Sequence, residues 1–589
     1  MRLVWALILV SILVAQDGAA VYQKHCDSCH RAGNDTRAPL LAALRLLPKP
    51  KILATLETGS MKAQGAALSA AERAAVAGYL AVAPGTEGQT AKGMCAGTPP
   101  PIQNPAGWNG WGADLINSRF QPAAAARLDG KRVGQLKLKW AFGLAGMSSA
   151  LAQPIEASGR LYFGSANGTV YSLDAKSGCT WWTFKAAAMV RTSITIAAHG
   201  AGRYALYFGD AKSNVYAIDA GGGAEIWKTQ VETHAYSRIT GAPVLYQGRL
   251  FVPVSSIEEV AAQNPKYVCC TFRGSVAALD ARDGKQIWKT HTIPDPPQPA
   301  GKNSAGTERV GPSGAAIWSA PTVDVKRRVL YVGTGNGYSN PEDSHSDAIM
   351  AYDLETGSVK WSAQMTPRDN WNMACINPNR ASCPESPGED LDFGSSPILK
   401  RVGGRDLLIA GQKSGIVHAL DPDKQGAIVW QTRIGRGGAL GGIEWGSAVD
   451  DEKVYVALSD IVSRQPEAGG GLFALRLADG SKVWHTPAPK PACAGKPGCT
   501  AAQMAAVTAI PGVVFSGSMD GHLRAYDTAD GRVIWDFDTL REFETVNGVA
   551  ARGGSLNAGG PVVAGGMLWV NSGYGALAGM PGNVLLAFE

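Results

Sequence analysis

The chain has 589 residues, of which 18% are charged, and its formal net charge is +6. This length is too great for one ordinary core, so two or more domains are expected. The small basic excess comes without runs of Lys and Arg, which argues against nucleic acid as a partner. Glycine (72 residues) and tryptophan (16 residues) are frequent, and this composition favours a β architecture with glycine turns over a helical or disordered one.

A short apolar run opens the sequence. The single basic residue Arg2 precedes thirteen apolar or small residues, Leu3 to Ala15. This run is too short for a membrane span and fits the apolar core of a signal peptide, with cleavage after Ala15 or Ala20. Residues 1–15 are therefore predicted to be a signal peptide, and no membrane span is expected after cleavage. An uncleaved anchor is the alternative.

The ten cysteines also indicate an exported protein. Two of them form a separate motif, described next, and the other eight are an even number. This usage is typical of an oxidising environment, so the protein is expected in the periplasm or outside the cell. Two local pairs are predicted to close loops as disulfides and a third pair follows by elimination: Cys375/Cys383, Cys493/Cys499 and Cys95/Cys179.

Residues 26–30 read Cys-Asp-Ser-Cys-His, the pattern by which haem c is attached. Two thiols must add to the two vinyl groups on one haem edge, and the adjacent imidazole of His30 must then reach the iron. A redox dithiol or half of a zinc site would also use Cys26 and Cys29. The adjoining His, the export signal and the lack of a second C-x-x-C favour haem.

A methionine is expected as the sixth iron ligand, because a thioether raises the haem potential. Met61 lies in a predicted loop, and Ser69 and Glu72 form a capping box for the helix that follows it. This arrangement resembles a class I cytochrome c, so Met61 is the predicted ligand; Met94, which lies beyond that helix, is the alternative. Residues 16–83 are predicted to be a small all-α cytochrome domain, and the Pro- and Gly-rich residues 84–105 a linker.

A repeat follows from residue 136 onward: a glycine turn, an alternating strand that usually ends in Asp, another glycine turn, and then Trp. Each copy predicts two antiparallel strands joined by a tight turn. Seven copies end at Trp182, Trp227, Trp288, Trp361, Trp430, Trp484 and Trp535.

An eighth unit is split between the two ends of the repeat region. Trp140 lacks a preceding strand, and the C-terminal strand at residues 583–588 lacks a following Trp. Joining them closes a ring, so residues 106–589 are predicted to be an all-β eight-bladed propeller. A propeller of this kind serves as an enzyme or as a non-catalytic scaffold, so function must be argued from residues aimed at its centre.

Several segments resemble the quinoprotein alcohol dehydrogenases, which hold pyrroloquinoline quinone (PQQ) and Ca²⁺. Residues 108–112, Trp-Asn-Gly-Trp-Gly, and residues 117–120, Asn-Ser-Arg-Phe, match the propeller entrance of that family. The resemblance implies the following roles: Trp318 stacks on the quinone, Thr240 and Ser256 contact it, Lys413 lies beside its oxygens, and Glu259 and Asn336 bind calcium.

The implied ligands fit the chemistry of the cofactor. PQQ is a flat tricarboxylate that needs an aromatic floor, hydrogen-bond donors and cations. Lys413, with Arg191 or Arg238, would balance its charge. The oxygens of Glu259 and Asn336 suit a hard cation that polarises the reactive carbonyl.

Two further features bear on this resemblance. In the family, adjacent cysteines cover the quinone, and this resemblance implies that role for Cys269 and Cys270; a purely structural disulfide is the alternative. The family base is the last Asp of a D-x-W-D motif, but residues 369–372 read Asp-Asn-Trp-Asn. Asn372, at the position of the base, cannot accept the proton. Asp369 in the same loop is the predicted base.

The order of cytochrome before propeller, together with residues 371–375, Trp-Asn-Met-Ala-Cys, is similar to the cytochrome-containing polyvinyl alcohol dehydrogenases, a branch of this family. The resemblance implies oxidation of a secondary or polymeric alcohol, with electrons passing through haem c to a soluble cytochrome c or a respiratory acceptor. Alternatives are a dehydrogenase of another alcohol or a sugar, a propeller scaffold, and an electron-transfer protein.

Overall fold

The computed structural model describes residues 17–31, 38–39, 41–45, 47–81, 92–103, 107–200, 202–461, 469–576 and 579–589. The predicted signal peptide lies outside the described residues. Within them, no helix is long and apolar enough to cross a membrane.

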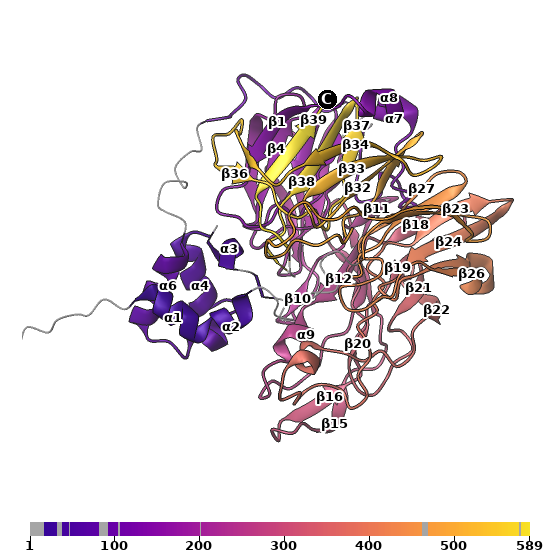
Figure 1. Cartoon of the computed structure of the whole chain (residues 1–589). Coiled ribbons are helices and arrows are strands. Elements are labelled where there is room, and N and C mark those ends of the chain that lie inside the picture. The colour runs from indigo at the N-terminus through magenta and orange to yellow at the C-terminus, as the bar shows by residue number, and fades with distance from the viewer. Residues whose placement is uncertain are drawn as a thin grey trace, which may run out of the picture.

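A small helical domain lies beside the larger β body of the molecule (Figure 1). Its last helix begins with the predicted capping box: the Ser69 hydroxyl accepts from the Glu72 amide (3.2 Å), and the Ser69 amide donates to the Glu72 carboxylate (2.8 Å). Val76 and Tyr22 are fully buried in its core. The helices of this haem domain are α1 (Gly18–His25), α2 (Asp27–His30), α3 (Leu41–Leu44), α4 (Lys49–Glu57), α5 (Lys62–Gly65) and α6 (Ala70–Leu80).

The β body consists, over its described residues, of eight antiparallel blades of four strands, one of which has an additional short strand, β11. This confirms the predicted eight-bladed propeller. The strands of the first four blades are β2 (Ile155–Ala157), β3 (Arg160–Phe163), β4 (Thr169–Asp174) and β5 (Thr180–Lys185); β6 (Thr195–Ala198), β7 (Tyr204–Gly209), β8 (Asn214–Asp219) and β9 (Glu225–Gln230); β10 (Ser237–Arg238), β11 (Val244–Tyr246), β12 (Arg249–Ser256), β13 (Ser275–Asp280) and β14 (Gln286–His291); β18 (Thr322–Asp324), β19 (Val329–Gly333), β21 (Ala348–Asp353) and β22 (Val359–Gln364).

The other four blades complete the ring. Their strands are β23 (Ile398–Val402), β24 (Arg405–Gly411), β25 (Ile416–Asp421) and β26 (Ala427–Arg433); β27 (Ala448–Val449), β28 (Lys453–Ala457), β29 (Leu472–Arg476) and β30 (Lys482–Thr486); β31 (Thr508–Ile510), β32 (Val513–Gly517), β33 (His522–Asp527) and β34 (Val533–Asp538); β37 (Val562–Ala564), β38 (Met567–Ser572), β39 (Val584–Phe588) and β1 (Leu138–Gly143).

Further short elements lie outside the blade strands, in loops within and between blades and before β1. They are the strand pairs β15 (Gln298–Lys302) with β16 (Glu308–Gly311), β17 (Ser313–Gly314) with β20 (Gly337–Ser339), and β35 (Glu542–Phe543) with β36 (Ala551–Arg552), and the helices α7 (Ala123–Ala126), α8 (Gly130–Val133), α9 (Glu258–Ala261), η1 (Met373–Ile376) and η2 (Pro422–Lys424).

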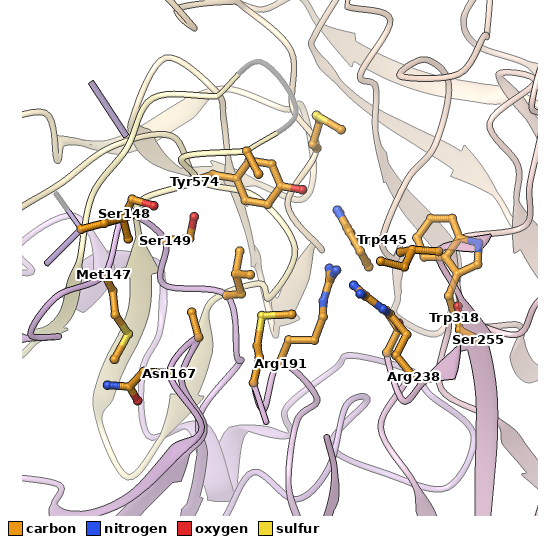
Figure 2. A pocket seen from close by; sticks show the side chains of 18 of the residues that line it. Met147, Ser148, Ser149, Asn167, Arg191, Arg238, Ser255, Trp318, Trp445 and Tyr574 are labelled. Atoms are coloured by element: carbon orange, nitrogen blue, oxygen red, sulfur yellow. The ribbon is translucent and has the colours of Figure 1, made fainter. Parts of the chain in front are cut away.

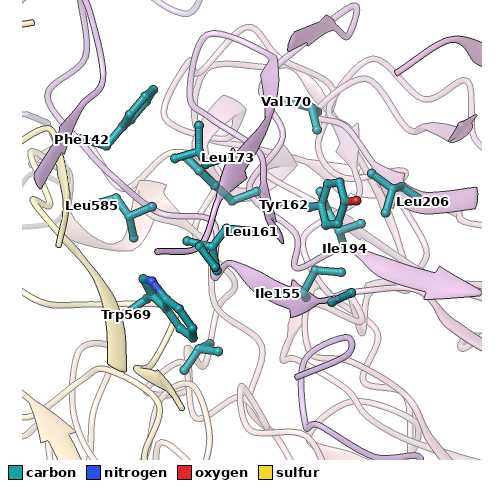
Figure 3. Packing of buried hydrophobic residues seen from close by; sticks show 14 of the residues in the cluster. Phe142, Ile155, Leu161, Tyr162, Val170, Leu173, Ile194, Leu206, Trp569 and Leu585 are labelled. Atoms are coloured by element: carbon teal, nitrogen blue, oxygen red, sulfur yellow. The ribbon is translucent and has the colours of Figure 1, made fainter. Parts of the chain in front are cut away.

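The ring closes by pairing the two ends of the propeller sequence, as predicted. Strand β1 runs antiparallel to β39, with Trp140 opposite Ala587. The apolar core continues across this closure, where Phe142 and Leu585 pack in one cluster with Leu161 and Trp569 (Figure 3). The first and last strands of the propeller therefore share a blade and a core.

Adjacent blades contact each other through a tryptophan and a glycine. The indole of Trp227 donates to the Ala281 carbonyl (3.0 Å), and its ring lies over Gly284, where a Cβ would come within 2.7 Å of ring atoms. This contact explains why the sequence repeat pairs a glycine turn with a tryptophan. The same ring-over-glycine contact recurs for Trp140/Gly178, Trp182/Gly223, Trp288/Gly357, Trp361/Gly426, Trp430/Gly480 and Trp484/Gly531.

Eight of the ten cysteines form four disulfides. The three predicted pairs are confirmed, and the neighbours Cys269 and Cys270 are bonded to each other. Cys26 and Cys29 keep their thiol groups.

We expect Gly284→Ala to lower the thermal unfolding temperature more than Gly248→Ala does. Both glycines have a positive φ near +74°, so both substitutions carry the cost of left-handed backbone, about 1–2 kcal/mol. Only Gly284 faces an indole; nothing lies within 4 Å of a Cβ at Gly248. Equal shifts of the two melting temperatures would contradict the role of the tryptophan–glycine contact.

Candidate functional site

The haem-attachment residues lie where α1 meets α2: Cys26 separates the two helices, and Cys29 and His30 belong to α2. The amides of Cys29 and His30 both donate to the Cys26 carbonyl (3.1 Å each). The buried His30 places Nδ1 2.6 Å from the Pro39 carbonyl. Because a carbonyl only accepts, Nδ1 carries the hydrogen, and Nε2 is the nitrogen left to bind iron. Burial, followed by the neighbouring Cys29, raises the pKa of the Cys26 thiol.

The two candidate methionines occupy different surroundings. Met61 follows α4 and packs against the core of the haem domain, as Cys26 does. Met94 is 51% exposed and pairs with Thr180 of the propeller as an isolated bridge. Met61 therefore shares a cluster with the attachment motif, whereas Met94 lies on the propeller.

A cavity of about 890 Å³ lies at the centre of the propeller and extends to the haem domain. It collects most of the site residues predicted from sequence, although they come from different blades. The predicted residues that line it are Arg191, Arg238, Thr240, Ser256, Glu259, Trp318, Asn336 and Lys413. Asp369, Asn372, Cys269 and Cys270 are not among its lining residues.

Two arginines project toward each other in this cavity (Figure 2). Burial lowers the pKa of Arg191, and burial together with the positive charge of Arg191 lowers the pKa of Arg238 to about 10. The buried Nη2 of Arg191 and Nε of Arg238 have no hydrogen-bond partner among the described residues. Two desolvated cations with unused donors fit an anionic ligand such as a tricarboxylate.

Two tryptophans form an aromatic wall beside the arginines. The rings of Trp318 and Trp445 meet edge to face with centroids 4.9 Å apart, and Arg191 lies over the Trp445 ring at 4.8 Å. A Cβ at Gly394 would lie 2.1 Å from the Trp318 ring, so this glycine makes room for the indole. Trp318 is therefore fixed where a flat ligand can stack on it.

Lys413 is held in the cavity by two aspartates. Its Nζ lies 2.9 Å from the Asp390 carboxylate and 3.1 Å from the Asp392 carboxylate. Of the two, Asp392 lines the cavity. The other oxygen of Asp392 accepts from the backbone amide of Asn336 (2.7 Å), so the carboxylate joins Lys413 to the backbone of Asn336.

Asp369 occupies a different place from the one its motif predicted. Its carboxylate accepts from the backbone amides of Asp390 (3.0 Å) and Leu391 (2.6 Å) and is buried away from the cavity lining. Burial raises the pKa of Asp369, and these hydrogen bonds oppose the shift. Asp369 thus holds the loop that presents Asp392, and the carboxylate beside the predicted cofactor residues is Asp392 itself.

Asn372 also stabilises the loop through the hydrogen bonds of its side chain. Its Oδ1 caps η1 by accepting from the Ala374 amide (2.9 Å), while Nδ2 donates to the carbonyls of Tyr338 and Ser382 (2.9 Å each). An Asn372→Asp substitution would remove both donated bonds and leave the new carboxylate facing two carbonyls. Its effect would therefore not be limited to adding a possible metal ligand.

The Cys269–Cys270 disulfide packs in an apolar cluster with Tyr338 and Trp371, outside the cavity lining. The Cys270 amide donates to the Val310 carbonyl (3.1 Å), and the Cys269 carbonyl accepts from the Val310 amide (3.0 Å). The disulfide therefore lies in the packed interior next to the cavity, where its surroundings fit a structural role.

Helix α9 connects this disulfide loop to the cavity. The buried Glu258 accepts from the Tyr267 hydroxyl (2.7 Å) and from the amides of Thr271 and Phe272 (2.8 Å each). Burial would raise the pKa of Glu258, but hydrogen bonds from His234 and the backbone outweigh it and lower the pKa. Glu258 therefore anchors α9, and its neighbour Glu259 lines the cavity.

The predicted calcium ligands Glu259 and Asn336 lie in the same cavity. The Asn336 Nδ2 donates to the carbonyls of Gly337 and Trp371 (2.8 Å each), which leaves its Oδ1 for a cation. No group of three or more His, Cys, Asp or Glu suited to a metal occurs in the described part of the chain. These oxygens fit a hard cation, whose remaining ligands must come from a bound group or water.

Sequence reasoning missed Asp392 and Trp445. Asp392 lies 20 residues after Asn372, beyond the loop closed by Cys375 and Cys383, so no spacing in the D-x-W-D region indicates it. A signal was present in the acidic run Asp390-Leu391-Asp392 directly before the next blade. Glu444 also lines the cavity.

Comparisons with known proteins agree with this geometry. Residues 108–378 match the family model for the glucose/ethanol/alcohol dehydrogenase β-propeller domain, residues 412–580 that for outer membrane protein assembly factor BamB, and residues 14–80 that for cytochrome c oxidase, cbb3-type, subunit III. The quinohemoprotein alcohol dehydrogenase structure from Comamonas testosteroni shares the fold, with a TM-score of 0.61 and 18% identity over 82% of this chain and 80% of that one.

Two relatives match along nearly their whole length. Polyvinylalcohol dehydrogenase from a Pseudomonas species is 41% identical over 100% of this chain and 97% of its own. Polyvinylalcohol dehydrogenase from Sphingopyxis sp. (strain 113P3) is 39% identical over 97% of this chain and 92% of its own. With the cytochrome domain, the propeller and the cavity described above, these matches show that the chain belongs to the polyvinylalcohol dehydrogenase family of PQQ-dependent, cytochrome-containing alcohol dehydrogenases.

Proposed function

We propose that this dehydrogenase oxidises the secondary alcohol groups of polyvinyl alcohol to ketones in the periplasm, and passes the electrons through haem c to an external cytochrome or respiratory carrier. The observation that supports this most directly is the cavity itself, in which Asp392, Lys413, Asn336 and two unpartnered arginine nitrogens converge. The names of the two full-length relatives support the substrate. The predicted signal peptide and the disulfides support export.

The residues around the cavity have distinct roles in holding PQQ. Arg191 and Arg238 neutralise its carboxylates, and Trp318 stacks on its rings. Thr240 and Ser256 add hydroxyl groups to the lining. When bound, PQQ accepts the hydrogen of the carbinol carbon together with its electron pair.

Calcium is assigned to Glu259 and the Oδ1 of Asn336. Both line the cavity, and a hard cation prefers such oxygen ligands. The carboxylate of Glu259, after burial, contributes to raising the pKa of the adjacent Tyr338 well above its ordinary value. A divalent cation at this position would relieve the local negative charge.

Asp392 is the proposed general base. Oxidation of a secondary alcohol removes two electrons and two protons, and the hydroxyl proton needs an acceptor in the cavity. Asp392 offers a carboxylate oxygen there, and Lys413 holds this carboxylate in place through the 3.1 Å ion pair. Asp369, the base predicted from sequence, becomes a positioning residue for the loop of Asp392.

Iron ligation is assigned to His30 and Met61. The orientation of His30 leaves Nε2 for the metal, and Met61 packs in the same cluster as Cys26. A haem held by these residues would supply a one-electron outlet for the two-electron site, which accounts for the fusion of a cytochrome domain to the propeller.

Anaerobic addition of polyvinyl alcohol or propan-2-ol to protein loaded with PQQ and Ca²⁺ should reduce the haem. The absorbance of the reduced haem follows the reaction directly. Omitting PQQ, or removing Ca²⁺ with a chelator, should abolish the absorbance change. Haem reduction by alcohol in the strict absence of PQQ would contradict the proposed function.

Asp392→Asn should lower kcat by roughly 10²- to 10⁴-fold, the usual contribution of a general base, while PQQ still binds. The matched control is Asp390→Asn, because Asp390 also pairs with Lys413 but does not line the cavity. The control should lose much less activity. If both variants lose activity equally, Asp392 acts only by holding Lys413.

Arg238→Gln should weaken PQQ binding by about 10- to 100-fold, because a hydrogen bond to a charged group contributes about 1.5–3 kcal/mol. The dissociation constant can be measured by quenching of tryptophan fluorescence. Arg203→Gln, at an exposed arginine between β6 and β7, is the control and should leave the constant unchanged. An unaltered constant in Arg238→Gln would remove this arginine from the cofactor site.

A further inference from the structure

The cavity is larger at one end than the cofactor residues require. Figure 2 shows Trp318, Trp445 and Arg238 on one side, and Met147 and Ser148 on the opposite side. The volume of about 890 Å³ lies near the top of the range of about 300–1,000 Å³ for small-molecule sites. A cofactor at the tryptophan end therefore leaves the second end for another molecule.

The haem domain forms part of this second end. Leu47, Pro48 and Lys51, at the start of α4, line the cavity together with propeller residues. Two glycines of the propeller allow this close approach. A Cβ at Gly146 would lie 3.3 Å from Pro48 Cδ, and one at Gly575 would lie 2.9 Å from Ala43 Cβ.

The linker completes the wall of this second end. The Cys95–Cys179 disulfide fastens it to the first blade of the sequence. Beside it, the Cys95 amide donates to the Thr180 carbonyl (3.0 Å) and the Thr180 amide to the Gly93 carbonyl (2.8 Å). This attachment holds Lys92 and Met94 in the cavity lining.

The chemistry of the two ends differs. The carboxylates that line the cavity, among described residues, are Glu259, Asp392 and Glu444, all near the cofactor residues. The second end combines apolar groups with hydroxyl, amide and ammonium donors, as in Leu47, Pro48, Lys51, Lys92, Met94, Met147, Ser148 and Asn167. Such a surface suits a neutral hydrocarbon chain that carries regularly spaced hydroxyl groups.

We propose that the haem domain is part of the substrate site: its residues Leu47, Pro48 and Lys51, with Lys92 and Met94 of the linker, hold the units of a polymeric alcohol that flank the reacting carbinol. This inference rests on the proposed function and names the part of the chain that selects long substrates. The haem domain then both receives the electrons and recognises the polymer.

The test compares Lys51→Trp with Lys49→Trp in the full-length holoenzyme. Both lysines are exposed in the first turn of α4, but only Lys51 lines the cavity. The rate of haem reduction is measured with propan-2-ol, pentane-2,4-diol and polyvinyl alcohol, and kcat/KM is expressed per hydroxyl group. Ala145→Trp, at a half-buried lining residue of the propeller, fills the same end from the other side.

We expect Lys51→Trp and Ala145→Trp each to lower the ratio of kcat/KM for polymer over propan-2-ol by about tenfold, comparable to the loss of one small contact in a pocket. Lys49→Trp should leave the ratio unchanged. An unchanged ratio in Lys51→Trp, an equal loss for both substrates, or a change only in the KM for the external electron acceptor would overturn the inference. If no alcohol reduces the wild-type haem, the proposed function fails instead.

Discussion

The structure depends on a repeated contact in which a tryptophan ring of one blade covers a glycine turn of the next. At Gly284, as at six other turns, a Cβ would meet the indole at less than 3 Å, so the glycine is required by contact as well as by its positive φ. The pairing of β1 with β39 closes the ring. Once the ring is closed, loops from different blades are directed to one centre, and residues more than 200 positions apart line one cavity.

The cavity at this centre contains charged side chains that are removed from water. Arg191 and Arg238 are desolvated and repel each other, while Lys413 is neutralised by Asp390 and Asp392. Burying like charges side by side destabilises the unliganded fold unless an anion compensates for it. The two arginines therefore favour binding of a polyanionic cofactor, and the ion pairs of Lys413 fix the carboxylates of Asp390 and Asp392 beside that lysine.

The sequence was sufficient for the fold and for most of the cavity, but it did not indicate Asp392, the proposed base. The regular spacing of Gly and Trp predicts the blades because each copy satisfies the same inter-blade contact. Trp318, Lys413 and Glu259 were predictable because they follow family segments at the ends of strands. Asp392 was not, because a disulfide-closed loop separates it from the motif, and only the hydrogen bonds from Asp390 and Leu391 to Asp369 bring that loop back to the cavity.

The contact between haem domain and propeller was also beyond sequence reasoning, because residues 84–105 read only as a linker. In the structure, part of that segment is attached to a blade by the Cys95–Cys179 disulfide and adjacent hydrogen bonds. A linker attached to a blade in this way reduces the freedom of the haem domain relative to the propeller. The same attachment places haem-domain and linker residues in the cavity wall, so in the proposed function electron transfer and access of substrate would depend on one arrangement of the two domains.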